Sequence, residues 1–128
     1  MKLRILVVDD DRVALALRKA LLESDGHEVV TASDGKEGLS RIEAEEGNMD
    51  LVFSDINMPV MDGIEMLRRL RDRWPEIPVI IISGESQPEI RKKAMEIGAN
   101  DFLLKPVLFK ALRRSISRVM ESWRKNKE

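Results

Sequence analysis

The sequence contains no cysteine and only one histidine. The lack of cysteine excludes a disulfide, a thiolate metal site and a cysteine nucleophile. His27 has no second histidine or cysteine with which to share a metal ion, so we expect it to be a surface residue that leads into a strand. Any metal site in this chain is therefore expected to use oxygen ligands.

Long apolar runs and a leader pattern are also missing. The run Leu3–Val8 is too short for a signal peptide and continues directly into three aspartates at positions 9–11. No run approaches the roughly 20 apolar residues that a helix needs to cross a bilayer. We therefore expect a soluble, cytoplasmic protein that has no membrane partner.

The composition is typical of one folded domain over residues 1–128. Hydrophobic residues make up 43% of the chain and charged residues 35%, which allows one core and excludes a disordered chain. The net charge of −1 does not favour nucleic-acid binding.

Positive charge is concentrated near the C-terminus. Residues 107–128 contain seven lysines or arginines against two glutamates, a local charge of +5. One interpretation is a C-terminal helix whose dipole favours cations, and the alternative is a docking surface for an acidic partner. Residues 122–128 are a candidate tail or the start of a linker.

Five short apolar runs, most of them bounded by turn residues, predict β-strands. These runs are Leu3–Val8, Glu28–Ala32, Leu51–Ser54, Pro78–Ile82 and Phe102–Leu104. Leu6–Val8 and Val79–Ile82 are apolar at every position, a pattern typical of strands that helices cover on both faces of a parallel sheet.

Between these runs, apolar residues recur at helical spacing. In the first helix we expect Val13, Leu17, Ala20 and Leu21 to face the core, with Arg18 off this stripe. The later stripes are Leu39 and Ile42; Ile64, Leu67, Leu70 and Trp74; Ile90, Ala94 and Ile97; and Leu108, Leu112, Ile116, Val119 and Trp123.

The alternation of strands and helices predicts an α/β fold with right-handed crossovers. No glycine-rich fingerprint follows the first strand, so dinucleotide binding is not favoured. The length favours a flavodoxin-like, five-stranded parallel sheet of order 2-1-3-4-5, flanked by five helices. In such folds the functional site lies at the carboxyl ends of the strands.

Reactive side chains follow four of the predicted strands. Asp9 and Asp10 follow the first strand, Asp55 the third, Ser83 the fourth and Lys105 the fifth. Three carboxylates at one edge would repel one another, and a divalent cation would offset this repulsion. Oxygen ligands favour Mg²⁺, with Mn²⁺ as an alternative.

Such a site suits phosphoryl transfer, in which a carboxylate can act as the nucleophile. The simpler alternative is that a strand-end aspartate only caps the following helix. We expect that capping role for Asp11, but capping does not explain complementary groups at four strand ends.

Four segments of the chain resemble the receiver domain of two-component response regulators, and the similarity covers essentially the whole chain. They are the LVVDD run that ends at Asp10, the segment Asp55–Pro59 followed by Asp62-Gly63, the position of Ser83, and the run GANDFLLKP that ends at Pro106. Each is a modest signal alone, but their order and separations together are specific.

The resemblance implies that Asp55 is the phosphoacceptor. It further implies that Asp9 and Asp10 hold Mg²⁺ together with the Asp55 carboxylate and the backbone carbonyl of Asn57. Lys105 would pair with the phosphoryl oxygens.

The resemblance also implies a switch. Ser83, where threonine is commoner, would move to hydrogen-bond the new phosphate, and Phe102 would rotate inward behind it. The alternative for Phe102 is an ordinary packed strand residue. Pro106 would follow a cis peptide bond. Asn57 and Glu85 would tune the phosphoryl lifetime, as in chemotaxis-type receivers. The affected surface would be the fourth helix, fifth strand and fifth helix.

The implied function is a phosphorelay signalling receiver, with no enzymatic activity beyond assisting its own phosphorylation and dephosphorylation. Its donor would be a sensor histidine kinase or a phosphotransfer protein. Its output would be a downstream protein, an effector domain in a longer chain, or a phosphorylation-dependent homodimer through the switch surface.

Two alternatives remain open. An interaction module on the same fold that is not phosphorylated would be expected to lose Asp10, Asp55 or Lys105, and all three are present. A phosphohydrolase that forms an aspartyl phosphate usually has its nucleophile after the first strand and a second aspartate two residues later. Here the pair after the first strand is adjacent.

Overall fold

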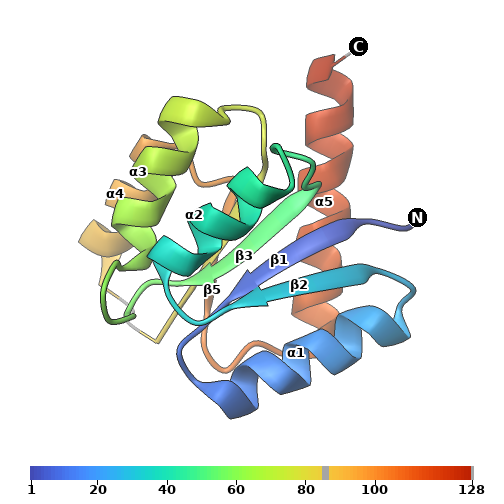
Figure 1. Cartoon of the computed structure of the whole chain (residues 1–128). Helices are drawn as coiled ribbons and strands as arrows, with labels where there is room; N and C mark the ends of the chain where they lie inside the picture. Colours follow the sequence, from blue (N-terminus) through green and yellow to red (C-terminus); the bar gives the residue numbers. More distant parts are fainter. Residues whose placement is uncertain (85–86, 128) are drawn as a thin grey trace.

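The computed structural model describes residues 1–84 and 87–127, which form one parallel sheet flanked by helices (Figure 1). The strands are β1 (Arg4–Val8), β2 (Glu28–Ala32), β3 (Leu51–Asp55), β4 (Val79–Ser83) and β5 (Asp101–Leu104). The helices are α1 (Arg12–Ser24), α2 (Gly35–Ala44), α3 (Gly63–Arg73), α4 (Pro88–Ile97) and α5 (Phe109–Lys127). The strand order is β2-β1-β3-β4-β5 and every pairing is parallel, which confirms the predicted fold.

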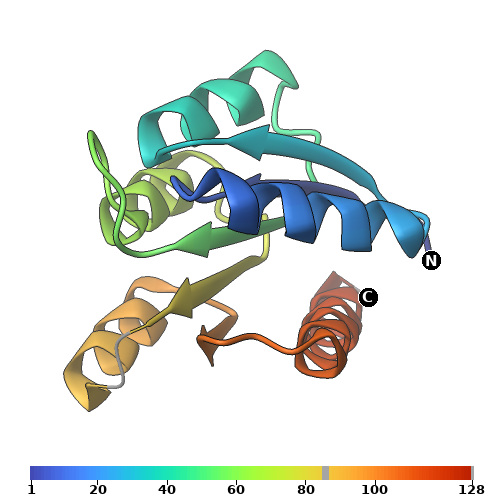
Figure 2. The same cartoon turned by 90° about the horizontal axis from the view of Figure 1, so that it is seen from below.

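The sheet separates two apolar cores. Helices α2, α3 and α4 pack on one face, and α1 and α5 pack on the other, as Figure 2 shows. Alternate residues of each central strand enter opposite cores, so Ile81 packs in the first and Ile80 and Ile82 in the second. All residues of β4 are buried, as its unbroken apolar sequence predicts.

The residues of α1 that face the sheet are not the ones that the sequence predicted. Val13 is 78% exposed and Leu17 is 60% exposed, whereas Leu22 is buried and Leu15 packs against the core shared with α5. Leu15, Arg18 and Leu22 follow one another at spacings of three and four, so Arg18 lies on the inward stripe. The prediction was wrong because it placed the charged Arg18 off the stripe that faces the core.

Helix α5 packs as predicted over most of its length. Its buried apolar residues include Leu112, Ile116 and Val119. Leu108 was wrongly included, because it precedes the helix and is exposed. Residues 122–127 continue the helix, and the Trp123 indole N–H donates to the Glu76 carbonyl at 2.7 Å.

Among the described residues, no helix combines the length and the apolar character that crossing a bilayer requires.

His27 has a structural role that the sequence did not predict. Its Nδ1 accepts a hydrogen bond of 3.0 Å from the Leu3 N–H, and the side chain is half-buried. Burial lowers the pKa of the imidazole, which favours the neutral ring that this bond requires. The bond ties the start of β1 to the start of β2.

Asp101 attaches α5 to the sheet. Its Oδ2 accepts hydrogen bonds from the Ser115 hydroxyl, at 2.7 Å, and from Arg118, and its Oδ1 accepts one from the Phe102 N–H at 2.8 Å. Burial alone would raise the pKa of the Asp101 carboxyl, but these hydrogen bonds outweigh it and the pKa is lowered.

The lowered pKa of Asp101 predicts a contribution to acid unfolding. The ionised carboxylate stabilises the fold above the unfolded-state pKa of about 3.9, and this contribution is lost as the pH falls through the folded-state pKa. We expect Asp101→Asn to cost about 1–3 kcal/mol at neutral pH and to flatten the loss of stability below about pH 4. Urea unfolding followed by circular dichroism across this range measures both. A profile parallel to that of wild type, or the same flattening in the exposed Asp72→Asn control, would contradict the assignment.

Candidate functional site

The carboxyl ends of β1, β3, β4 and β5 bring the predicted polar residues to one edge of the sheet. Asp9 follows β1 directly, and Lys105 follows β5. Asp55 and Ser83 are the last residues of β3 and β4, one residue further than predicted, and both are buried. The Lys105 N–H donates to the Ser83 carbonyl at 2.8 Å, which continues the pairing of β4 with β5 beyond the end of β5.

The three predicted carboxylates meet at this edge. Asp9, Asp10 and Asp55 each offer an oxygen, and these oxygens lie within 4.8 Å of one another. Asp9 and Asp55 are buried, whereas Asp10 is exposed. Carboxylates this close repel one another, and a divalent cation offsets the repulsion. Their all-oxygen donor set fits a hard ion such as Mg²⁺ and could hold one.

Two cationic side chains also reach the carboxylates. The Lys105 ammonium lies 2.6 Å from Asp55 Oδ2, and the Arg18 guanidinium lies 2.6 Å from Asp9 Oδ2. The sequence predicted that Lys105 would lie at this edge, but not Arg18. The signal that could have identified Arg18 is its position between Leu15 and Leu22 on the inward stripe of α1.

Backbone contacts fix the Asp9 carboxylate. Its Oδ1 accepts a hydrogen bond of 2.9 Å from the Asp11 N–H. Asp11 in turn caps α1, because its side chain accepts from the N–H groups of Val13 and Ala14. The capping role predicted for Asp11 is thus confirmed, and the start of α1 is tied to the orientation of Asp9.

The backbone of Asp55 is held just as closely. The Ser54 hydroxyl donates to the Asp55 carbonyl at 2.8 Å, and the Gly63 N–H donates to the Ile56 carbonyl at 2.8 Å. A Cβ added to Gly63 would lie only 2.2 Å from the Asp55 carbonyl oxygen. The Asn57 N–H donates to Asp55 Oδ1 over a longer distance of 3.4 Å. The loop from β3 to α3 therefore wraps tightly around the end of the strand.

The remaining predicted site residues lie around this centre. Phe102 is buried, and the Arg91 guanidinium of α4 lies 5.9 Å from the centre of its ring and donates to its carbonyl at 3.4 Å. The peptide bond Lys105–Pro106 is cis. Glu85 lies outside the described residues.

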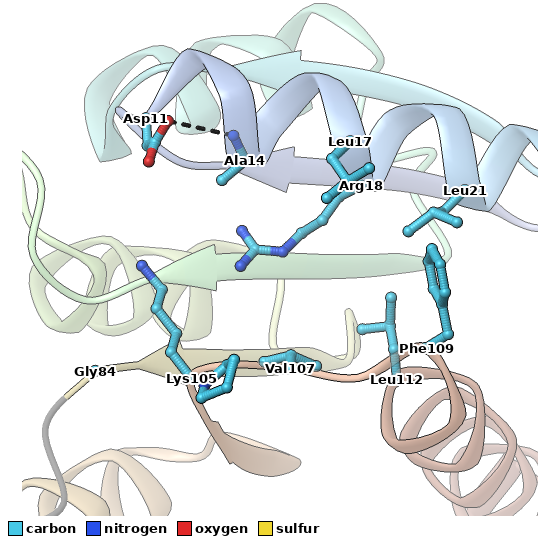
Figure 3. A pocket seen from close by; sticks show the side chains of 11 residues that line it. Asp11, Ala14, Leu17, Arg18, Leu21, Gly84, Lys105, Val107, Phe109 and Leu112 are labelled. Atoms are coloured by element: carbon cyan, nitrogen blue, oxygen red, sulfur yellow. Dashed lines mark hydrogen bonds between the residues drawn. The ribbon is translucent and has the colours of Figure 1, made fainter.

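A cleft of about 570 Å³ opens beside the site, between α1 and the segment that joins β5 to α5. Apolar side chains, among them Leu17, Leu21 and Phe109, line most of it. Figure 3 shows Arg18 and Lys105 extending their charged groups toward the other end of this cleft. The exposed side chain of Leu17 therefore lines the cleft.

Comparison with known proteins agrees with this geometry. The family model of the response regulator receiver domain matches residues 5–117. The transcriptional regulatory protein PrrA of Mycobacterium tuberculosis is 41% identical over 109 residues, which are 85% of this chain and 46% of PrrA. The autoinducer sensor kinase/phosphatase CqsS of Vibrio cholerae is 41% identical over 106 residues, 80% of this chain and 15% of CqsS. The chain thus spans less than half the length of these two curated relatives.

Solved structures match over nearly the whole chain. A CheY-like receiver domain protein from Methanospirillum hungatei has a TM-score of 0.91 and 32% identity, and the match covers 98% of this chain and 99% of that one. A chain of the CheX–CheY complex with BeF3 and Mg²⁺ from Borrelia burgdorferi has a TM-score of 0.88 and 29% identity, over 91% and 88%. With its parallel sheet and acidic edge, this chain belongs to the response regulator receiver domain family.

Proposed function

We propose that this chain is a phosphoacceptor receiver that takes a phosphoryl group onto the Asp55 carboxylate. The observation that carries the proposal is the convergence of Asp9, Asp10 and Asp55 at one sheet edge, with the Lys105 ammonium 2.6 Å from Asp55 Oδ2. A nucleophile, a place for a divalent cation and a fixed positive charge are the parts that phosphoryl transfer needs.

In the proposed reaction a carboxylate oxygen of Asp55 attacks the phosphorus of the donor. A phosphorus–oxygen bond forms as the bond from phosphorus to the leaving group breaks, and the product is an acyl phosphate. Lys105 balances the charge on the phosphoryl oxygens. Mg²⁺, held by the three carboxylates and the carbonyl of Asn57, would supply further charge neutralisation. Catalysis is then mostly positioning and electrostatics.

The buried hydroxyl of Ser83 and the ring of Phe102 are the proposed switch elements. We propose that Ser83 bonds the new phosphate and that phosphorylation holds the Phe102 ring inward, since this ring is already buried in the described structure. Arg91 of α4 contacts both the ring and the carbonyl of Phe102, so a movement of Phe102 would alter the surface formed by α4, β5 and α5. We also propose that the exposed Asn57, with Glu85, helps to orient the water that hydrolyses the acyl phosphate.

The proposed donor is a sensor histidine kinase or a phosphotransfer protein, which the similarity to the kinase/phosphatase CqsS supports. The output partner would bind the surface formed by α4, β5 and α5, either as another protein or as a second copy of this chain. Lys110 and Arg114 are exposed there in the first half of α5, where a helix dipole does not favour cations. The helix dipole therefore does not account for these two cations, and a docking surface for an acidic partner is the better explanation of them.

Phosphorylation by acetyl phosphate tests the proposal. We expect wild type to gain the mass of one phosphoryl group in the presence of Mg²⁺ and none in its absence, and we expect Asp55→Asn to gain none. Intact-mass spectrometry on acid-quenched samples, from seconds onward, limits loss by hydrolysis. Asp72→Asn, which changes an exposed aspartate on α3, should behave as wild type. Absence of any gain in wild type at every time point and with either Mg²⁺ or Mn²⁺ would favour an interaction module that is not phosphorylated.

A further inference from the structure

We infer that Arg18 competes with the divalent cation for the Asp9 carboxylate and thereby lowers the metal affinity of the unphosphorylated site. The inference rests on the proposed metal site at Asp9, Asp10 and Asp55. It assigns to Arg18 a role in setting how readily the site fills with metal.

Both oxygens of the Asp9 carboxylate already have partners. Oδ1 accepts from the Asp11 N–H at 2.9 Å, and Oδ2 accepts from the Arg18 guanidinium at 2.6 Å. A carboxylate has about four lone-pair positions, so a metal ion could bind beside either donor. The guanidinium would then lie within a few ångströms of a dication, and their repulsion opposes binding.

Burial makes this repulsion significant. The Asp9 side chain is 0% exposed and that of Arg18 is 12% exposed. Solvent ions screen charges at such depth far less than at the surface. A buried carboxylate that loses its charged partner lowers the stability of the fold, so Arg18 stabilises the metal-free protein. Metal binding therefore has to overcome the repulsion between the dication and the guanidinium at Asp9 Oδ2, or displace that guanidinium.

The charges of the site favour the same conclusion. The cluster formed by the three carboxylates, Arg18 and Lys105 has a net charge of −1, and the same cluster without Arg18 has a net charge of −2. A dication binds the more negative site more strongly. The cleft between α1 and α5 gives the displaced guanidinium somewhere to go, because the Arg18 side chain already borders it (Figure 3).

Metal titration of the intact chain tests this role. We expect Arg18→Gln to bind Mn²⁺ with a dissociation constant about tenfold lower than wild type, as counted from free Mn²⁺ by electron paramagnetic resonance, because one close charge has been removed. Arg18→Lys keeps the charge and should bind close to wild type. The matched control is Arg12→Gln, which removes one exposed charge from the first turn of the same helix and should change affinity less than twofold.

Thermal denaturation gives a second readout that does not depend on activity. Without metal, Arg18→Gln should melt below wild type because Asp9 has lost its partner, and saturating Mn²⁺ should remove most of this difference. A purely structural arginine would lower the melting temperature equally with and without metal, and that result would overturn the inference. So would a variant that stays unfolded at saturating Mn²⁺.

The outcomes also separate this inference from the proposed function. Equal or weaker Mn²⁺ binding by Arg18→Gln, with clear binding by wild type, overturns the role of Arg18 and leaves the metal site intact. Failure of every variant and of wild type to bind Mn²⁺ or Mg²⁺ overturns the metal site, and the role of Arg18 with it.

Discussion

Replacement of Gly63 by alanine is expected to lower the free energy of unfolding by about 3 kcal/mol or more. A Cβ at this position would lie 2.2 Å from the Asp55 carbonyl oxygen and 3.0 Å from the Ile56 Cα. Both are backbone atoms, so neither can rotate away as a side chain could. Overpacking usually costs about 1–3 kcal/mol, and a clash this close with backbone atoms lies at the upper end or above. The end of β3 would have to move, and the Asp55 carboxylate with it.

Urea unfolding of Gly63→Ala and of Gly84→Ala measures this effect with a matched pair. A Cβ at Gly84 would meet nothing within 4 Å, so that variant should differ little from wild type. Alanine is ordinarily the better residue in a helix, by up to about 1 kcal/mol, which makes any loss at Gly63 a lower bound on the steric cost. Equal stability of the two variants would refute the steric explanation.

Replacement of Lys105 by methionine is expected to slow phosphorylation of Asp55 by about 100-fold while leaving metal binding in place. Among the described residues, the Lys105 ammonium is the cation paired with the acceptor carboxylate, and it lies 2.6 Å from Asp55 Oδ2. Loss of one preorganised charge or donor at a reacting centre costs about 10²–10³-fold in rate. The three carboxylates remain, so affinity for Mn²⁺ should be unchanged or higher.

A time course with acetyl phosphate and saturating Mg²⁺, read by intact mass, gives the rate for Lys105→Met. Lys110→Met removes an exposed lysine from α5 and controls for the change in overall charge. A rate within threefold of wild type would remove Lys105 from the mechanism, whereas loss of metal binding would show that the substitution disturbs the whole site.

The fold was predictable because its signals are local. Unbroken apolar runs such as Val79–Ile82 indicated central strands, and the alternating helical stripes indicated crossovers, which leave few possible sheet orders. The face of α1 was not predictable in this way. Apolar residues occupy two adjacent stripes of that helix, and the stripe that turns inward is the one that carries Arg18, whose partner Asp9 lies nine positions earlier in the chain.

The site was predictable to the extent that its residues follow strands. Asp9, Asp10, Asp55 and Lys105 meet because parallel strands end at the same edge. Arg18 and Gly63 reach the site from helices, and their contacts depend on side-chain length and on the path of a loop. The pattern of strand ends reports neither quantity, although the spacing of Arg18 between Leu15 and Leu22 was a signal that Arg18 faces inward.

The anchoring of α5 through Trp123 has a spectroscopic consequence. The chain has two tryptophans and no tyrosine, so Trp74 and Trp123 account for its near-ultraviolet fluorescence. Trp74 is the C-cap of α3, and the Trp123 indole N–H donates to the Glu76 carbonyl shortly before β4 begins. Both residues therefore lie near the amino end of β4, opposite the aspartates at the carboxyl ends of the strands. Emission intensity should therefore report detachment of the C-terminal helix and remain nearly silent when the acidic edge binds an ion.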